Sequence, residues 1–103
     1  MGAYVELLLV DLHFPQAGSL KAKRSELQSV KAQLHGRHGL TVAEVDHQDT
    51  WQRSTLAAAL TGGSPAVLQA STDRVVRWLE ERFPEGVRIR RTLASYEDLE
   101  GLG

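Results

Sequence analysis

The pattern of apolar and polar residues divides the chain into six segments of regular structure. Residues 3–14, "AYVELLLVDLHF", are apolar at both alternating positions for most of their length, which is typical of a central strand. Glu6 interrupts the even-numbered positions, so we expect Tyr4, Leu8 and Val10 on the less buried face. Residues 40–46, 53–60 and 87–93 alternate more regularly and predict three further strands.

Two segments with apolar residues at helical spacing separate these strands. Residues 19–37 predict a helix that is capped by Ser19 and carries one apolar stripe, made of Leu20, Leu27, Val30 and Leu34. Residues 64–83 predict a second helix, with Ser64 as its cap and Pro65 at its first position.

The order of these elements, β-α-β-β-α-β, predicts the fold class. Two right-handed crossovers with interleaved strands form a ferredoxin-like α+β fold, with a four-stranded antiparallel sheet and both helices on one face. Residues 1–96 are expected to form this single domain, and residues 97–103 a frayed tail.

Composition narrows the class of protein further. A chain of 103 residues, 42% hydrophobic and 24% charged, suits one globular domain. The absence of cysteine excludes disulfides, thiolate metal sites and cysteine nucleophiles. The chain shows no signal-peptide pattern and no apolar run near the roughly 20 residues needed to cross a membrane, so we expect a cytoplasmic protein. A net charge of -1 means that any nucleic-acid binding requires a local basic patch.

Two charged stretches that are distant in sequence should meet at one end of this fold. These stretches are "SLKAKR", residues 19–24, and "EVDHQDTWQR", residues 44–53. Lys23 falls in the middle of the apolar stripe of the first helix, where an apolar residue would be expected. We therefore predict a carboxylate partner for Lys23, and the topology makes Asp11 and Asp46 the nearest candidates.

The exposed charges of these stretches allow two interpretations. Lys21, Lys23 and Arg24 could be solvated charges with one structural ion pair, or they could form an anion site at the start of the helix. In the second case Arg53 would add a phosphate contact. Trp51 would then stack on a base or anchor a partner, whereas in the first case it packs over the hairpin.

Neither a metal site nor a catalytic group is expected. The spacing of Asp46, His47 and Asp49 matches no established ligand pattern, and acids are common at hairpin tips for reasons of turn geometry. His35 and His38 are spaced for one helix face, but they stand at a helix C-terminus, where histidine is favoured electrostatically. No nucleophile, base and orienting group are evident together, so we expect no cofactor and a non-enzymatic protein.

The open face of the sheet is a candidate for self-association. Its predicted residues combine apolar and basic side chains, namely Tyr4, Leu8, Val10, Leu56, Arg88 and Arg90. An uncovered apolar face is unusual, so a homodimer is a plausible interpretation. RNA binding in the manner of an RRM domain is disfavoured, because that mode needs aromatic residues in the central strands.

"SLKAKR" and "VAEVDHQDTWQR", with the leading "ELLLVDLHFP", resemble the YlxP-like family of small uncharacterised bacterial proteins. The resemblance extends to about residue 95. It rests on shared motif residues, namely Ser19, Leu20, Lys21, Lys23, Arg24, Glu44, Val45, Asp46, Gln48, Asp49, Trp51, Gln52 and Arg53. It implies the ferredoxin-like fold and a bacterial cytoplasmic setting. Because the family is typically encoded beside ribosome-maturation and translation-initiation genes, it also implies RNA or ribosome association, but no activity, catalytic residue or cofactor.

Two functional hypotheses follow. In the first, the protein associates with RNA or a ribosome-assembly component through Lys21, Lys23, Arg24, Trp51 and Arg53. In the second, it is a protein–protein module that forms a homodimer through the open sheet face. The sequence alone identifies neither the partner nor the oligomeric state.

Overall fold

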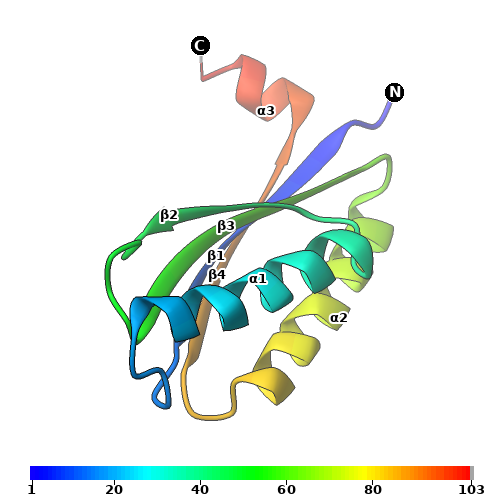
Figure 1. Cartoon of the computed structure of the whole chain (residues 1–103). Helices are drawn as coiled ribbons and strands as arrows, with labels where there is room; N and C mark the ends of the chain where they lie inside the picture. The colour runs from blue at the N-terminus through cyan, green and yellow to red at the C-terminus, as the bar shows by residue number, and fades with distance from the viewer. Residues whose placement is uncertain (103) are drawn as a thin grey trace.

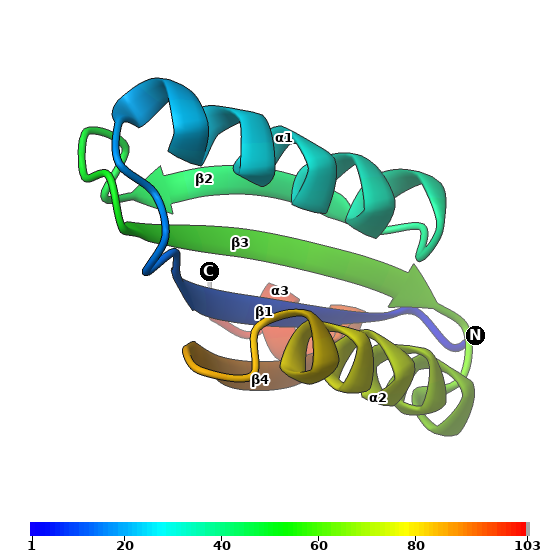
Figure 2. The same ribbon diagram turned by 60° about the horizontal axis from the view of Figure 1, so that its bottom comes forward.

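The predicted order of strands and helices is confirmed in a computed structural model, which describes residues 1–102. The elements are β1 (Tyr4–His13), α1 (Leu20–Gly36), β2 (Thr41–Asp46), β3 (Arg53–Gly62), α2 (Pro65–Arg82), β4 (Val87–Ser95) and α3 (Tyr96–Glu100). The sheet has the order β2-β3-β1-β4, and all neighbouring strands are antiparallel. Figures 1 and 2 show α1 and α2 on the same face of the sheet. This is the predicted ferredoxin-like α+β arrangement.

Both predicted helix caps are present. The Ser19 hydroxyl accepts a hydrogen bond from the backbone N–H of Ala22 at 3.1 Å. The Ser64 hydroxyl accepts one from the N–H of Val67 at 3.5 Å, and Pro65 opens α2. After α1, Gly39 adopts φ of +73°, a left-handed conformation that glycine reaches without steric cost.

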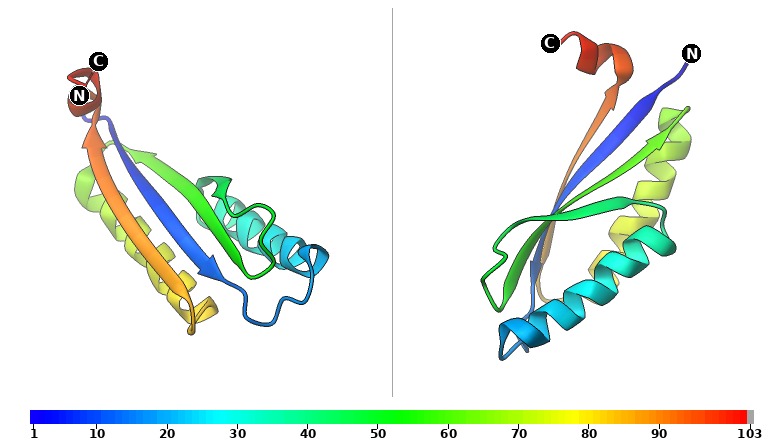
Figure 3. Two further views of the ribbon diagram at one scale, coloured as in Figure 1. Left: turned by 90° about the vertical axis from the view of Figure 1, so that its left-hand side faces the viewer. Right: turned by 45° about the horizontal axis from the view of Figure 1, so that its top comes forward.

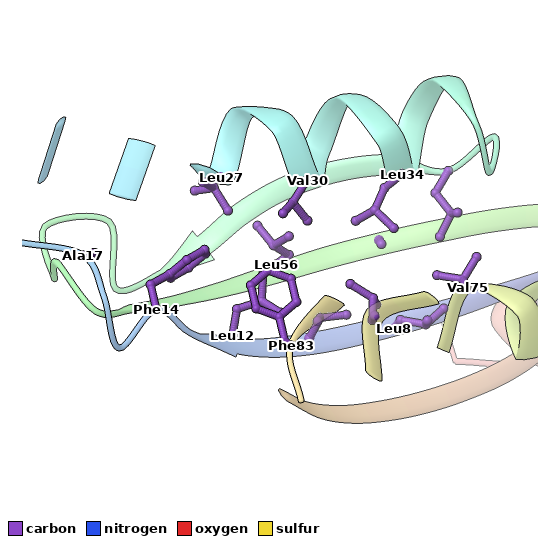
Figure 4. Close-up of a cluster of buried hydrophobic side chains, with 14 residues drawn as sticks. Leu8, Leu12, Phe14, Ala17, Leu27, Val30, Leu34, Leu56, Val75 and Phe83 are labelled. Atoms are coloured by element: carbon purple, nitrogen blue, oxygen red, sulfur yellow. The ribbon is translucent and has the colours of Figure 1, made fainter. Parts of the chain in front are cut away.

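The hydrophobic core lies between the sheet and the two helices, as Figure 4 shows. The stripe of α1 contributes Leu27, Val30 and Leu34, which meet the even-numbered side of β1. The other buried hydrophobic residues of this cluster are Leu8, Val10, Leu12, Phe14, Ala17, Leu40, Leu56, Ala58, Val75, Leu79 and Phe83. The core therefore covers the helix-facing side of the sheet and leaves the opposite side without a helical layer.

The predicted orientation of β1 is wrong, and so is most of the predicted open face. Leu8, Val10 and Leu56 have no exposed surface and belong to the core. Tyr4 lies on the same side of β1 by strand alternation and is half-buried. Glu6 suggested exposure of this side because carboxylates are seldom buried, but the structure buries Glu6 among polar partners.

The observed open face carries the odd-numbered residues of β1. Leu7 pairs with Ala59 of β3, and Leu9 pairs with Ala57. Of the predicted residues, Arg88 and Arg90 do lie on this face, since they pair with Asp11 and Leu9. The open face is therefore apolar in the middle of the central strands, around Leu7 and Leu9, and basic along part of β4.

The expectation of a frayed tail is wrong for residues 97–100, which belong to α3. Ser95 and Asp98 form a reciprocal capping box, in which each side chain accepts a hydrogen bond from the other residue's backbone N–H at 3.0 Å. Figure 3 shows α3 beside the N-terminus, beyond the end of the sheet. Of the predicted tail, residue 103 lies outside the described residues.

Candidate functional site

The two charged stretches converge at the end of the sheet where β1 finishes, as predicted. The backbone N–H of Phe14 donates to the carbonyl of Gln52 at 2.8 Å, which joins the loop after β1 to the β2–β3 connection. The Gln52 side chain also donates to the carbonyl of Ala17 at 3.4 Å. Figure 3 shows the two loops side by side near the start of α1. We call residues 14–24 and 44–53 the charged end.

Lys23 is the buried centre of the charged end. Its side chain has 0% exposure, and its Nζ donates to Glu44 Oε2 at 3.1 Å. It also donates to the carbonyls of His47, at 2.6 Å, and of Gln48, at 3.3 Å. An ammonium has three N–H donors, so these three acceptors satisfy it completely.

These contacts fix the shape of the β2–β3 connection. The ladder between β2 and β3 is irregular between Glu44 and Asp46, and His47 then adopts φ of +60°. Few non-glycine residues adopt this left-handed conformation, so it requires support from its surroundings. Lys23 provides that support, because it binds the His47 carbonyl from α1.

The predicted partners of Lys23 are wrong, although a carboxylate partner exists. Asp11 instead accepts a hydrogen bond from the Thr55 hydroxyl at 2.7 Å, and Asp46 accepts one from the N–H of His47 at 2.8 Å. Asp11 points to the open face, whereas Glu44 pairs with the buried Leu56 and faces α1. Lys23 was also a predicted phosphate contact, and that prediction is wrong because its ammonium is buried and fully bonded.

Glu44 is held in its charged form. Burial alone opposes ionisation of this carboxyl, but hydrogen bonds from Ser54 and Lys23 outweigh it and lower the pKa of Glu44 below its ordinary value. The Ser54 hydroxyl, itself buried, donates to Glu44 Oε2 at 2.6 Å. Glu44 therefore holds Lys23 and Ser54 on one carboxylate oxygen.

The remaining cations of the charged end face solvent. Lys21, Arg24 and Arg53 are exposed, and none of them forms an ion pair within residues 1–102. Trp51 lies between the hairpin tip and Arg53 in sequence and is 52% exposed. A shallow groove runs beside the connection, lined by Arg24, Leu27, Gln28, Lys31, Glu44 and Gln48. Exposed cations and an exposed indole at the same end of a fold can together hold an anionic ligand that also carries a flat ring.

A second polar cluster, which the sequence did not predict, lies between the sheet and α2, toward the end of the sheet opposite the charged end. Glu6 is 2% exposed, and its Oε1 accepts hydrogen bonds from Nε of Arg91, at 2.9 Å, and from the hydroxyl of Thr72. Arg91 also pairs with Asp73 at 2.7 Å. In the last strand, Arg91 alternates in step with Ile89, so it falls on the side that faces the helices. An arginine on that buried side needs a carboxylate partner, and this was the sequence signal that could have identified Glu6.

Comparison with known proteins matches residues 5–92 to a family described as "Protein of unknown function (DUF503)". The chain belongs to the DUF503 family. It is 32% identical over 81 residues to the uncharacterized protein YlxP of Bacillus subtilis (strain 168), which covers 79% of this chain and 84% of that protein. These findings confirm the YlxP-like resemblance.

Comparison with solved structures bears on the fold of this chain and not on its function. The de novo designed protein Foldit4 superposes with a TM-score of 0.52 and 10% identity, covering 87% of this chain and 96% of the designed one. Within residues 1–102, no three His, Asp or Glu side chains gather as a metal site would require, and no helix is long and apolar enough to cross a membrane. In this DUF503 protein, the charged end carries the features from which a function can be inferred.

Proposed function

We propose that this protein is a small non-enzymatic cytoplasmic module that binds structured RNA, in ribosome assembly or translation, through its charged end. Lys21, Arg24 and Arg53 contact phosphates, and Trp51 stacks on an unpaired base. The observation that carries the proposal is that the charged end bears the exposed Trp51 and three exposed cations that have no ion-pair partner in residues 1–102.

The rigidity of the charged end supports this proposal. Binding costs less when the contacting groups are already ordered, because little side-chain and loop entropy is lost. Lys23 ties α1, which carries Lys21 and Arg24, to the connection that carries Trp51. Gln52 ties the same connection to the loop after β1. The four proposed contact residues therefore lie on segments that these hydrogen bonds hold together.

The site is proposed for the charged end because the open face lacks a stacking platform. RRM-type sheets stack bases on aromatic residues in their central strands. The corresponding open-face positions here hold Leu7, Leu9, Ala57 and Ala59. Cation contacts to phosphate give affinity with little sequence preference, so recognition of a folded RNA would depend on shape and on the base at Trp51.

The test is binding of purified protein to ribosomal RNA and to ribosomal subunits across a salt series. The triple variant Lys21→Ala, Arg24→Ala, Arg53→Ala should lose most of the salt-dependent affinity, because each phosphate contact releases counterions. A matched triple variant, Arg37→Ala, Arg74→Ala, Arg77→Ala, removes the same charge from exposed positions elsewhere, at the C-cap of α1 and on α2.

The control variant shows whether RNA binding depends on the cations of the charged end or only on net charge. Retained binding in the control with loss in the first variant, both of them folded, supports the site. Equal weakening of both variants would mean that only net charge matters. Absence of measurable binding by the natural protein at low salt would reject RNA association altogether.

A further inference from the structure

The open face of the sheet is apolar at its centre. Leu7, in the middle of β1, is 44% exposed, although it lies on a central strand. Its neighbours across the sheet are Ala59 and Thr92, and the next row holds Leu9 with Ala57. Neither α1 nor α2 covers this side (Figure 2). Leu7 therefore marks the centre of an unpartnered apolar face.

Opposite charges stand at the two ends of this face along one strand. Arg88 and Arg90 precede Thr92 on β4 and point to the open side. Beyond the other end of β4, α3 carries Glu97 and Glu100. Within residues 1–102, none of these four side chains forms an ion pair. The open face thus has a basic end, where Asp11 lies opposite Arg88, and an acidic end on α3, with Leu7 and Leu9 between them.

We propose that a second copy of this chain covers the open face, packed sheet to sheet and antiparallel, with α3 of each copy lying against Arg88 and Arg90 of the other. A two-fold axis between the faces, running across the strands near Leu7, produces this arrangement. Such a rotation reverses strand direction but keeps each strand opposite its own counterpart. β4 therefore meets β4 of the second copy.

The spacing along β4 fits this rotation. At roughly 3.3 Å per strand residue, Arg88 lies about 13 Å before Thr92, and Tyr96 lies about as far beyond it. An axis at the Leu7–Thr92 row therefore brings the start of α3 opposite Arg88 of the second copy. Glu97 follows Tyr96 directly and Glu100 lies about one helical turn after it, so both ends of the dimer place these acids near the arginines.

The apolar side of α3 extends the contact surface. Tyr96 is 56% exposed and Leu99 is 49% exposed. Together they line a shallow depression at the acidic end of the sheet with Gly2, Ala3, Tyr4, Thr61 and Gly62. Figure 1 shows α3 beyond the end of the sheet, apart from α1 and α2. In this position α3 can contact a molecule that binds the open face.

A second copy is favoured over an unrelated partner because the surface is complementary to itself. A two-fold interface uses one patch twice, so a basic end must meet an acidic end for the patch to match its own image. The arrangement also leaves Lys21 and Arg24 on α1, outside the interface. Arg53, however, pairs with His13 on the open side of β1, next to the row of Arg88, so only the α1 part of the proposed RNA site is independent of the dimer.

The test combines charge reversals in a mixing experiment, followed by sedimentation velocity over a concentration series. One variant carries Arg88→Glu with Arg90→Glu, and the other carries Glu97→Arg with Glu100→Arg. Asp98 stays unchanged because it caps Ser95. Each variant alone faces like charges at both ends and should sediment as a monomer. An equimolar mixture has opposite charges at both ends and should recover a particle of twice the chain's mass.

A second pair of variants tests the apolar centre. Leu7→Arg should abolish the dimer, whereas Val67→Arg, at an exposed position of α2, should leave it unchanged. Thermal melts should show that both variants remain folded. A natural protein that stays monomeric at every concentration overturns the proposal, as does a mixture of charge variants that fails to associate. Loss of RNA binding by Arg88→Glu with Arg90→Glu, in a protein that is always monomeric, would assign this face to RNA instead.

Discussion

Lys23 and Glu44 are separated by 21 positions in the chain, yet Nζ of the lysine lies 3.1 Å from Oε2 of the glutamate. The pair links the first turn of α1 to β2. The same ammonium binds two backbone carbonyls of the β2–β3 connection, so one buried side chain holds three parts of the charged end together. Its removal should therefore affect both stability and the placement of Trp51.

The first prediction concerns Lys23→Met, which keeps the length of the side chain and removes its charge. Glu44 would remain partly buried without its cation, and two carbonyls would lose their donor. We expect the free energy of unfolding to fall by about 3 kcal/mol, as for other broken buried pairs. Urea denaturation measures this change. Lys21→Met, at an exposed position on the same helix turn, should change stability by under about 0.5 kcal/mol.

The second prediction concerns acid sensitivity. The pKa of Glu44 is lower in the folded protein than its ordinary value of about 4.3. The charged carboxylate therefore contributes stability that is fully present above about pH 4.3 and is lost as the pH falls through the lower folded value. Glu44→Gln should be less stable than the natural protein at neutral pH, and this difference should shrink toward about pH 3.

Unfolding measured at several pH values checks this expectation. A stability difference between Glu44→Gln and the natural protein that stayed constant down to about pH 2 would contradict it, because the glutamine cannot titrate.

The third prediction separates two neighbouring arginines of β4. Arg91→Leu leaves Glu6 buried without its cation and should cost about 3–5 kcal/mol. Arg90→Leu changes an exposed side chain that has no ion-pair partner in residues 1–102, and should cost under about 0.5 kcal/mol. Chemical denaturation of both variants gives the comparison.

A double variant shows whether the cost comes from the stranded charge. Glu6→Leu combined with Arg91→Leu should recover part of the lost stability, because an apolar pair leaves no uncompensated charge. If the double variant is as unstable as the sum of its single changes, then Glu6 and Arg91 do not act as a pair.

The fourth prediction concerns Trp51 in RNA binding. Trp51→Ala should weaken binding to structured ribosomal RNA by about 1–3 kcal/mol, the usual contribution of one stacked base. The slope of affinity against salt should stay unchanged, because no phosphate contact is lost. Filter binding across a salt series provides both values.

Tyr96→Ala is the matched control, since it removes an exposed aromatic residue at the opposite end of the sheet. Equal losses in the two variants would show that Trp51 has no special role. A changed salt slope in Trp51→Ala would mean that the substitution disturbs the neighbouring cations rather than a stacked base.

The order of the elements, the two helix caps and the end of the sheet where the charged stretches meet all follow from the amino-acid sequence. These features depend on local signals, namely strand alternation, helical spacing and capping serines, together with the short list of topologies that such an order permits. Lys23 was also identified as needing a carboxylate, because a lysine in an apolar stripe must find a partner.

The buried face of β1 and the carboxylate that binds Lys23, by contrast, depend on how the elements pack in three dimensions. Both faces of β1 are apolar enough to be buried, so alternation alone could not choose between them. Glu6 favoured the wrong answer, because Arg91 and Thr72, distant in sequence, satisfy it inside the fold. Glu44 rather than Asp11 or Asp46 binds Lys23 because the direction of each side chain follows from strand register, which is set by pairing between strands.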